Sequence, residues 1–341
     1  MKNSVLLIAC LSGGWMPLYG VWSQVFHKKI AQDEAKRASE QHVFYFSRHD
    51  ISPFTQLLVS WNALRPQRGH FTFYTQVRNA RTKKWGAWHR MFDWGSTVQR
   101  SHESRSDGFS KYFHVRLELD PLHQADAFRI KVEALDGADL QLLKCIGVTA
   151  VHMREFVPER DLRTFKALCS VYIPGVDKVS QRSLVHKDNH RMCSPVSCSV
   201  LSSFLSKREI NPLAFAGLSY DSGLNSYGSW PFNMAHSFEY TKGKVWFFHT
   251  RLSSFKELHR QLCRGIPVVV SVRGMLENAP QPYPHGHLLT VIGYDARLQR
   301  VICHDSAKEG HANVEQSYDL KGFLHAWEAS RRLTYWAEWA K

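Results

Sequence analysis

Cys193 stands at a point where the sequence predicts the start of a buried helix. Ser194 suits the N-cap, Pro195 suits the first helical position, and positions 200, 201, 204 and 205 supply an apolar face. Free backbone N–H groups and the positive end of the helix dipole favour a thiolate over a thiol there. A thiolate is the attacking species in cysteine acyl-transfer chemistry, so Cys193 is the candidate nucleophile. Cys198 lies past the first turn of the same helix, and we expect it to be a small core residue.

A histidine opens a predicted strand at 287–294, and an aspartate comes directly after the next predicted strand, at 301–304. A regular hairpin centred on residue 296 makes His287 and Asp305 a cross-strand pair, with Cβ atoms about 5 Å apart on one face. A carboxylate beside an imidazole fixes its tautomer and stabilises its charged form. The pattern therefore predicts His287 as the base and Asp305 as its orienting group. Gln181 could donate its amide to an oxyanion beside the N–H of Cys193.

The elements that carry these residues are helices interleaved with strands. Residues 254–257 form a capping box before an amphipathic helix, and Gly265 stands where that helix should end. Residues 266–272 follow as a near-continuous apolar strand. This mixture predicts an α+β domain over residues 158–341.

Residues 42–157 have a different pattern, that of an all-β unit. Apolar and polar residues alternate over 71–77, 113–119 and 128–134, the period of strands with one buried face. The pattern predicts a β-sandwich. Tryptophans at 61, 85, 88 and 94 could form an aromatic platform for sugars, although packing in the core is the favoured interpretation.

The second domain resembles the papain-like cysteine peptidases, in particular the family that includes the bacteriocin-leader (double-glycine) processing peptidases. The resemblance covers about residues 179 to 335, and the order Gln, Cys, His, Asp is that of the family. It rests on the motifs Val179-Ser180-Gln181, Cys193-Ser194-Pro195, Gly228-Ser229-Trp230-Pro231-Phe232-Asn233, Gly265-Ile266-Pro267-Val268-Val269, Gly286-His287-Leu288-Leu289 and His304-Asp305-Ser306-Ala307. A stand-alone, exported subgroup with an N-terminal β-sandwich is similar in arrangement.

The resemblance implies a fold in which a central helix packs on an antiparallel sheet. It also implies Gln181 as the oxyanion donor and Cys193 as the nucleophile, with His287 as the acid/base and Asp305 as its orienting group. Two motifs depart from the usual pattern: Val196 stands where threonine is common, and His304-Asp305-Ser306 replaces the usual Asn-Asp-Pro. The residue types of the triad survive both changes.

Trp230 and Asn233 either line the substrate cleft or only begin a packed helix. The sequence leaves both interpretations open.

A zinc site is an alternative for the same histidines. His285 and His287 are two residues apart on a predicted strand and so could share a face. Further ligands could come from His304, Asp305 and His311. No second cluster at ligand spacing supports this alternative, so no metal and no organic cofactor is expected. The cysteines at 145, 169, 263 and 303 lie in apolar contexts and are predicted to be core residues.

The composition is that of a globular protein: 341 residues, 44% hydrophobic and 22% charged. It excludes a disordered chain and a multi-span membrane protein. A formal net charge of +14 would attract anionic partners such as an acidic envelope polymer. No run of five or more Lys or Arg occurs, so the charge is spread out and no nucleic-acid partner is expected. Seven cysteines are too few for a disulfide scaffold.

The first 23 residues predict a targeting segment. No Asp, Glu, Lys or Arg occurs from residue 3 to 27, and residues 5–10 form an apolar centre. This is typical of a secretory signal, with Ser23 just before the cleavage point. A lipoprotein box ending at Cys10 and a retained membrane anchor are the alternatives. Residues 24–41 are polar and predict a spacer or an exposed helix.

Together these features predict an exported protein, periplasmic, envelope-bound or secreted, of α+β class. A β-sandwich precedes a papain-like hydrolase that cleaves a peptide or amide bond in a peptide or protein substrate. Acyl transferases and peptidoglycan-type amidases use the same constellation. The alternative from another class is a catalytically silent scaffold whose sandwich binds a surface glycan, an anionic envelope polymer or a protein.

Overall fold

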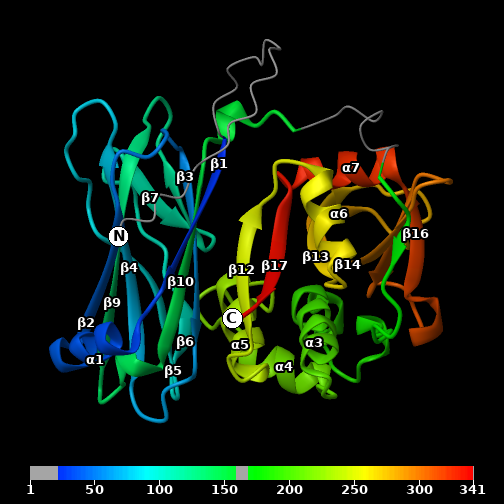
Figure 1. The fold of residues 1–341 in the computed structure, drawn as a ribbon, viewed down its shortest axis with the longest axis horizontal. Coiled ribbons are helices and arrows are strands. Elements are labelled where there is room, and N and C mark those ends of the chain that lie inside the picture. Colours follow the sequence, from blue (N-terminus) through cyan, green and yellow to red (C-terminus); the bar gives the residue numbers. More distant parts are fainter. Residues whose placement is uncertain (1–21, 159–167, 341) are drawn as a thin grey trace, which may run out of the picture.

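Two packed sheets form the N-terminal half of the computed structural model, which describes residues 22–158 and 168–340 (Figure 1). The sheet that faces the rest of the molecule, the inner sheet, has the order β1-β10-β3-β8-β7. Its strands are β1 (Ser23–Lys29), β3 (Gln56–Ala63), β7 (Ser110–Phe113), β8 (Arg116–Leu119) and β10 (Leu143–Val151). The outer sheet has the order β2-β9-β4-β5-β6. Its strands are β2 (Val43–Arg48), β4 (His70–Asn79), β5 (His89–Gly95), β6 (Gln99–Ser101) and β9 (Ala125–Leu135).

Aromatic side chains fill the space between these two sheets. Trp61 of β3 and Trp94 of β5 are fully buried, and the ring of Phe73 stacks on Trp61 with centroids 4.3 Å apart. The predicted β-sandwich is confirmed. Two of the four tryptophans are therefore core residues and cannot contact a sugar. Trp85 and Trp88 lie nearer the surface, each beneath a basic side chain.

The predicted strand at 113–119 is instead a tight hairpin. Phe113 at the end of β7 pairs with Arg116 at the start of β8. Between them, His114 and Val115 have φ angles of 45° and 58°, in the left-handed region that hairpin turns require. A period-two pattern cannot reveal such a turn. Because valine is β-branched, its positive φ is a strained conformation.

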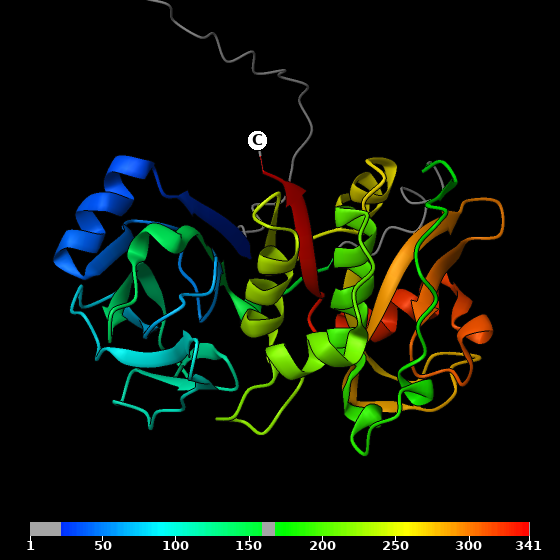
Figure 2. The same cartoon turned by 90° about the horizontal axis from the view of Figure 1, so that it is seen from below.

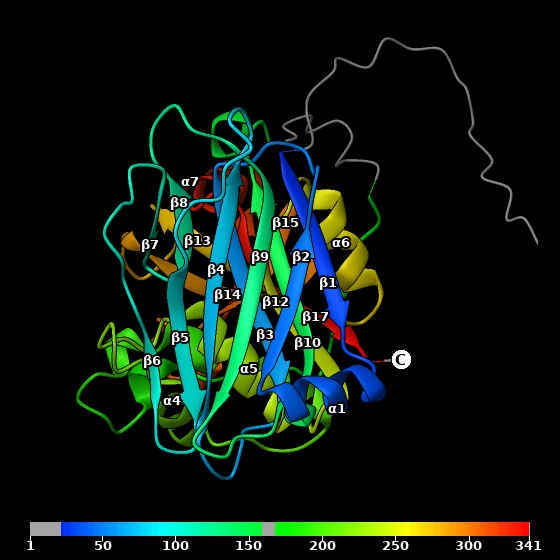
Figure 3. The same cartoon turned by 90° about the vertical axis from the view of Figure 1, so that its left-hand side faces the viewer.

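Residues 24–41, for which a spacer or an exposed helix was expected, belong to the folded domain. β1 pairs with β10 along its whole length. α1 (Gln32–Gln41) is a helix with a mostly exposed surface, and it lies across one end of the sandwich (Figure 3). The polar sequence of β1 hides its strand character because it is an edge strand whose side chains are mostly half-exposed.

The predicted targeting segment falls largely on residues 1–21, outside the described residues. Trp22 is described and buried, and its ring meets that of Phe156 edge-on at 4.8 Å. Ser23 begins β1. Cleavage after Ser23 would therefore remove two residues of the fold. None of the helices described for the chain combines the length and the apolar character that crossing a membrane requires.

Helices packed on one antiparallel sheet form the C-terminal half (Figure 2). The sheet has the order β12-β17-β13-β14-β15-β16, and β11 pairs with β14. Its strands are β11 (Val171–Tyr172), β12 (Val245–Arg251), β13 (Val268–Gly274), β14 (Tyr283–Asp295), β15 (Arg300–Asp305), β16 (Glu315–Asp319) and β17 (Leu333–Trp339). The helices are α3 (Cys193–Ser206), α4 (Pro212–Ser219), α5 (Trp230–Tyr240), α6 (Phe255–Cys263) and α7 (Leu320–Ala329). The predicted α+β class is confirmed.

The residues of the predicted capping box begin α6, although both of their hydrogen bonds are displaced by one residue from those of a regular capping box. The Ser254 hydroxyl oxygen accepts a hydrogen bond from the N–H of Lys256 at 2.9 Å. The Glu257 carboxylate accepts from the N–H of Ser253 at 3.0 Å. Gly265 follows the helix with φ of 74°, and β13 comes next as expected. The capping residues therefore fix where this helix begins, as the sequence predicts.

The inner sheet packs directly on the C-terminal half. Asn62 of β3 donates through Nδ2 to the carbonyl of Phe247 at 3.0 Å, and its Oδ1 accepts from the N–H of Phe247 at 2.8 Å. The His27 ring stacks on Phe248 with centroids 3.7 Å apart. Phe232 of α5 is part of the sandwich core. The sandwich is therefore fixed against β12 and α5.

Candidate active site

Cys193 is the first residue of α3, which starts two residues earlier than Ser194 and Pro195 predicted. The Ser194 hydroxyl does not cap the helix but shares a hydrogen bond with the Tyr335 hydroxyl at 2.8 Å. The N–H of Cys193 belongs to the first turn, where backbone donors have no intrahelical acceptor. Cys193 is half-buried and Cys198 is fully buried. The positive helix end thus acts on Cys193, as expected.

His287 lies between Cys193 and Asp305. Its Nε2 donates to Oδ1 of Asp305 at 2.8 Å, and its ring interacts with the Cys193 side chain. His287 is 4% exposed and Asp305 is fully buried. A nucleophile, a base and an orienting group therefore lie next to one another in space.

The register that brings His287 to Asp305 differs from the predicted one. Asp305 lies opposite Leu289, and a bulge interrupts the ladder between Val291 and Gly293. The pair was expected to be directly opposite. His287 is instead two residues from that position, hence on the same face, and reaches Asp305 diagonally.

Two tyrosines that the sequence analysis did not identify complete the surroundings of Asp305. The hydroxyls of Tyr283 and Tyr318 both donate to Oδ2 at 2.6 Å, and the N–H of Ala307 donates to Oδ1 at 3.0 Å. The Tyr283 ring also stacks on His287, with centroids 4.2 Å apart. Tyr283 is four residues before His287 on one strand, a spacing that could have indicated a shared face. Tyr318 comes from β16, and no sequence signal marks it.

The pKa values favour an ion pair. Burial raises the pKa of the Cys193 thiol, but the hydrogen bond and positive charge of His287, aided by nearby backbone N–H groups, outweigh it, so the pKa lies below its ordinary value. Burial lowers the pKa of His287, but Asp305 and Cys193 raise it to about 9. Burial opposes the charge on Asp305 as well, yet its donors lower its pKa to about 2. These directions all favour thiolate, imidazolium and carboxylate together.

Gln181 is held at the same end of the site. Its N–H donates to the Ser306 carbonyl at 2.9 Å, and its Oε1 accepts from the Ser306 hydroxyl at 2.8 Å. Its Nε2 donates to the Asn189 carbonyl at 3.0 Å, an oxygen that also accepts from the N–H of Met192. The amide is thus tied both to the residue after Asp305 and to the turn that precedes Cys193.

This arrangement coincides with a match to a known family. The model of the Peptidase_C39 like family matches residues 174–335. The C-terminal half is a Peptidase_C39-like domain. The match includes Gln181, Cys193, His287 and Asp305 and leaves the sandwich outside. No curated protein and no solved structure is similar enough to the chain to count as a match.

Trp230 and Asn233 differ in their placement within the peptidase-like domain. Trp230 is half-exposed and lines a cavity between the two halves. Asn233 is fully buried, and its Nδ2 donates to the carbonyls of Tyr227 and Ser229 at 2.9 and 2.8 Å. Asn233 therefore orders the start of α5 and does not line a cleft, which is the second of the two interpretations that the sequence left open for it.

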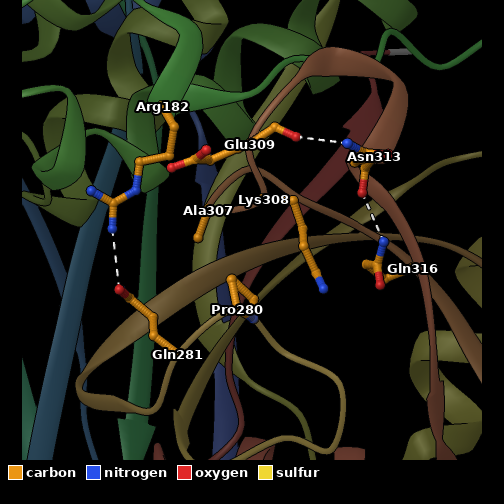
Figure 4. A pocket seen from close by; sticks show the side chains of 8 residues that line it. All are labelled: Arg182, Pro280, Gln281, Ala307, Lys308, Glu309, Asn313 and Gln316. Carbon is orange, nitrogen blue, oxygen red and sulfur yellow. Dashed lines mark hydrogen bonds between the residues drawn. The ribbon is translucent and has the colours of Figure 1, made fainter.

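One cavity of the peptidase-like domain, about 630 Å³ in volume, is lined in part by Arg182 and Ala307, which follow Gln181 and Ser306 in the sequence. Arg182 follows Gln181 and donates to Oε1 of Gln281 at 3.2 Å. The cavity is lined by Arg182, Pro280, Gln281, Ala307, Lys308, Glu309, Asn313 and Gln316 (Figure 4). The lining residues carry charges of both signs, so this cavity does not favour a ligand of one charge.

A second cavity, about 570 Å³ in volume, lies between the sandwich and the peptidase-like domain. Gly286, which precedes His287, lines it together with Trp230. The strained turn residues His114 and Val115 line it from the sandwich side. Both halves of the molecule thus reach the neighbourhood of the base.

The histidines of the alternative zinc set do not converge in the described residues. His304 bonds to the carbonyl of Asp177 and His311 to the backbone at Ser180, whereas His287 bonds to Asp305. A different trio, Cys169, His259 and Cys263, has potential ligand atoms within 4.8 Å of one another. The Nε2 of His259 is already hydrogen-bonded to the Cys169 carbonyl at 2.8 Å. This trio could hold a thiophilic ion through Nδ1 and the two thiols.

Two of the four cysteines expected in the core are on the surface. Cys145 and Cys303 are buried, and burial raises the pKa of each. Cys169 and Cys263 are exposed. Cys263 ends α6, where the apolar side chains before it face the core and its own faces solvent. Apolar neighbours in the sequence therefore do not determine whether a cysteine side chain is buried.

Proposed function

We propose that the protein is an exported cysteine peptidase that hydrolyses peptide bonds with Cys193. The observation that carries the proposal is the position of His287, which is hydrogen-bonded to Asp305 and interacts with Cys193. The Peptidase_C39-like domain implies a peptide substrate. The apolar segment at the N-terminus supports export.

The proposed reaction begins from the thiolate–imidazolium pair. The Cys193 sulfur attacks the carbonyl carbon of the scissile bond and forms a tetrahedral oxyanion. The N–H of Cys193 and the amide of Gln181 stabilise that oxygen. His287 gives its proton to the leaving amine, and an acyl-enzyme remains.

The second half of the reaction restores the free enzyme. A water enters after the amine departs, and neutral His287 takes its proton as the water attacks the thioester. The tetrahedral intermediate then expels the Cys193 thiolate and releases the acid. Throughout, Asp305 keeps Nε2 protonated, so that Nδ1 is the nitrogen that exchanges protons with Cys193 and with the substrate.

The test measures the reactivity of each cysteine. The folded chain from Trp22 onward is treated with limiting iodoacetamide across about pH 5 to 9, and mass spectrometry gives the alkylation rate of every thiol. Cys193 should react well below the ordinary thiol pKa of about 8.5, faster than Cys169 or Cys263, which are exposed internal controls. In His287→Ala the alkylation midpoint of Cys193 should move upward and its lead disappear.

The same experiment separates the alternatives. If Cys193 reacts no faster than Cys263 at any pH, the thiolate is not activated. The hypothesis of a catalytically silent scaffold is then the better one. Where Cys193 is activated, a peptide library scored by mass spectrometry for new termini tests hydrolysis. Adding an amine nucleophile then tests transfer: an amide product in place of the free acid would indicate an acyl transferase.

A further inference from the structure

The cavity between the sandwich and the peptidase-like domain has a strongly basic lining. Four arginines line it: Arg116, Arg251, Arg273 and Arg331. Glu118 is the acidic residue among the lining residues, and it is already paired, since Nε of Arg116 donates to its carboxylate at 2.6 Å. Three guanidinium groups therefore remain without a carboxylate in the cavity.

Arg251 shows that the cavity is built around positive charge. It is 6% exposed, and it lies at the end of β12. Its Nε donates to Oε1 of Gln56 at 3.0 Å, and its Nη1 donates to the carbonyls of Ser330 and Arg331 at 2.8 and 2.9 Å. Within the described part of the chain, no acceptor is found for Nη2. A nearly buried guanidinium with an unused donor is suited to a carboxylate ligand.

The arginines also act on one another. Burial, together with the positive charges of Arg116 and Arg331, lowers the pKa of Arg251 to about 9. Like charges held close together destabilise the folded protein by repulsion. An anion bound in the cavity would offset this repulsion. The two domains maintain this arrangement, because Arg116 comes from the sandwich and Arg251 from the peptidase-like domain.

The position of the cavity relates it to the proposed reaction. Gly286 and Arg273 line it, and Val272, next to Arg273, pairs with His287 across β13 and β14. Trp230 supplies an apolar wall. A volume of about 570 Å³ accommodates a few residues of an extended peptide.

We propose that this cavity, lined by Arg251, Arg273 and Arg331 with the β7–β8 hairpin of the sandwich, is a substrate subsite that binds an acidic side chain of the peptide. The inference rests on the proposed function and assigns the sandwich a share of specificity. A guanidinium binds a carboxylate with two parallel hydrogen bonds, which an amide of the same shape cannot match. The subsite therefore selects aspartate or glutamate over asparagine or glutamine.

The experiment measures binding without turnover. The Cys193→Ala chain is titrated against fluorescein-labelled decapeptides in which a central Glu-Glu pair is replaced by Gln-Gln or Lys-Lys, and anisotropy gives each Kd. The Glu-Glu peptide should bind about tenfold more tightly than its amide counterpart. This preference should weaken as salt rises, since part of the cavity is exposed to solvent.

Variants locate the effect. Arg273 and Arg331 are both exposed, so Arg273→Gln/Arg331→Gln should fold normally and reduce the preference to about twofold or less. Arg105→Gln removes an exposed arginine outside the cavity and should leave the tenfold ratio unchanged. Arg116→Gln tests the sandwich side. It leaves the Glu118 carboxylate without its arginine, and this added negative charge in the cavity should also reduce the ratio.

The outcomes distinguish this subsite from the proposed reaction. An equal affinity for the acidic and amide peptides, or a preference that survives the double variant, overturns the subsite even if Cys193 cleaves peptides. Acidic binding that depends on these arginines supports the subsite even if Cys193 proves unreactive, and then only the proposed hydrolysis fails.

Discussion

Asn62 of the sandwich replaces a neighbouring strand for Phe247 of the peptidase-like domain. Its side-chain amide makes both hydrogen bonds, donating to the carbonyl at 3.0 Å and accepting from the N–H at 2.8 Å. Asn62 is completely buried. A buried backbone N–H and C=O are thereby satisfied at the point where the inner sheet meets β12. The relationship couples the stability of one half to that of the other.

We therefore expect Asn62→Ala to destabilise the whole molecule. Both Phe247 groups would lose their partners in a buried place, at a cost of about 2–4 kcal/mol. Urea unfolding, followed by the fluorescence of the buried tryptophans, measures the change in free energy. Gln41→Ala, at an exposed amide that ends α1, is the control and should change it by less than about 0.5 kcal/mol. A loss for Asn62→Ala as small as the control's would mean that the two halves are not coupled here.

Tyr283 and Tyr318 are positioning residues, because they act on His287 through Asp305. Tyr283→Phe and Tyr318→Phe each remove one donor from Oδ2 and leave the aromatic ring in place. The pKa of Asp305 should rise, although the carboxyl stays ionised at about pH 6. Because it is held by one donor fewer, Asp305 should orient the His287 ring less firmly, and the Cys193 thiolate should be stabilised less. We expect each change to lower the alkylation rate of Cys193 at about pH 6 by roughly threefold to tenfold.

A matched control exists for these hydroxyls. Tyr172 donates to Glu315 at 3.2 Å on the exposed edge of the same sheet. Tyr172→Phe should leave the pH profile of Cys193 alkylation unchanged. If Tyr283→Phe and Tyr318→Phe lower thermal stability but leave that profile where it was, their role is structural only.

Asp305 should also make the free energy of unfolding depend on pH. Its pKa of about 2 in the folded protein lies below the ordinary value of about 3.9, so its contribution is present above about pH 4. It is lost as the pH falls through about 2, because protonation removes the ion pair in the folded state. From the shift, the contribution is about 2–3 kcal/mol.

Asp305→Asn tests this contribution. The variant should be less stable than the wild type at about pH 7, and the difference should shrink as the pH approaches about 2. Urea unfolding at several pH values gives both curves. Asp136→Asn, at an exposed position, should cost little at any pH. A difference for Asp305→Asn that stays constant from about pH 7 to 2 would contradict a lowered pKa.

The residues that do chemistry were predictable because each carries a local signal. A cysteine before an apolar helix and a histidine opening an apolar strand both follow from period and capping. The exact register of His287 was not predictable. Asp295 pairs with Arg300, so the hairpin is centred between residues 297 and 298 and not at 296, and a bulge before Gly293 then moves the ladder back by one residue. The diagonal contact survived because a shift of two residues returns a side chain to the same face.

Features that depend on distant packing were not predictable. Asn233 belongs to a conspicuous motif, yet its amide is used by two carbonyls of the preceding loop. β1 has a polar sequence without a strand pattern, and it is a strand because it pairs with β10, which is far away in the sequence. The hairpin at His114 and Val115 requires positive φ at two residues that seldom adopt it, so nothing local announces it.

The first described residues bear on where a signal could be removed. The carbonyl of Trp22 accepts from the N–H of His152 at 2.7 Å, and the Trp22 side chain is buried against Phe156. The Ser23 hydroxyl donates to the carbonyl of Arg251, across the two halves, at 2.9 Å. Cleavage before Trp22 keeps these contacts, whereas cleavage after Ser23 removes them. We therefore expect a mature chain that begins at or before Trp22.

Three purified chains, which start at Val21, Trp22 and Gln24, test this expectation. A chain starting at Gln24 should be less stable than one starting at Trp22 by about 2–4 kcal/mol, the sum expected from burying one tryptophan and making two hydrogen bonds. A chain starting at Val21 should be as stable as the chain starting at Trp22, because both retain Trp22 and Ser23. Intact-mass analysis of the exported protein then gives the natural N-terminus. A terminus at Gln24, together with equal stability of the chains that start at Trp22 and Gln24, would show that Trp22 and Ser23 are dispensable and that the original cleavage prediction holds.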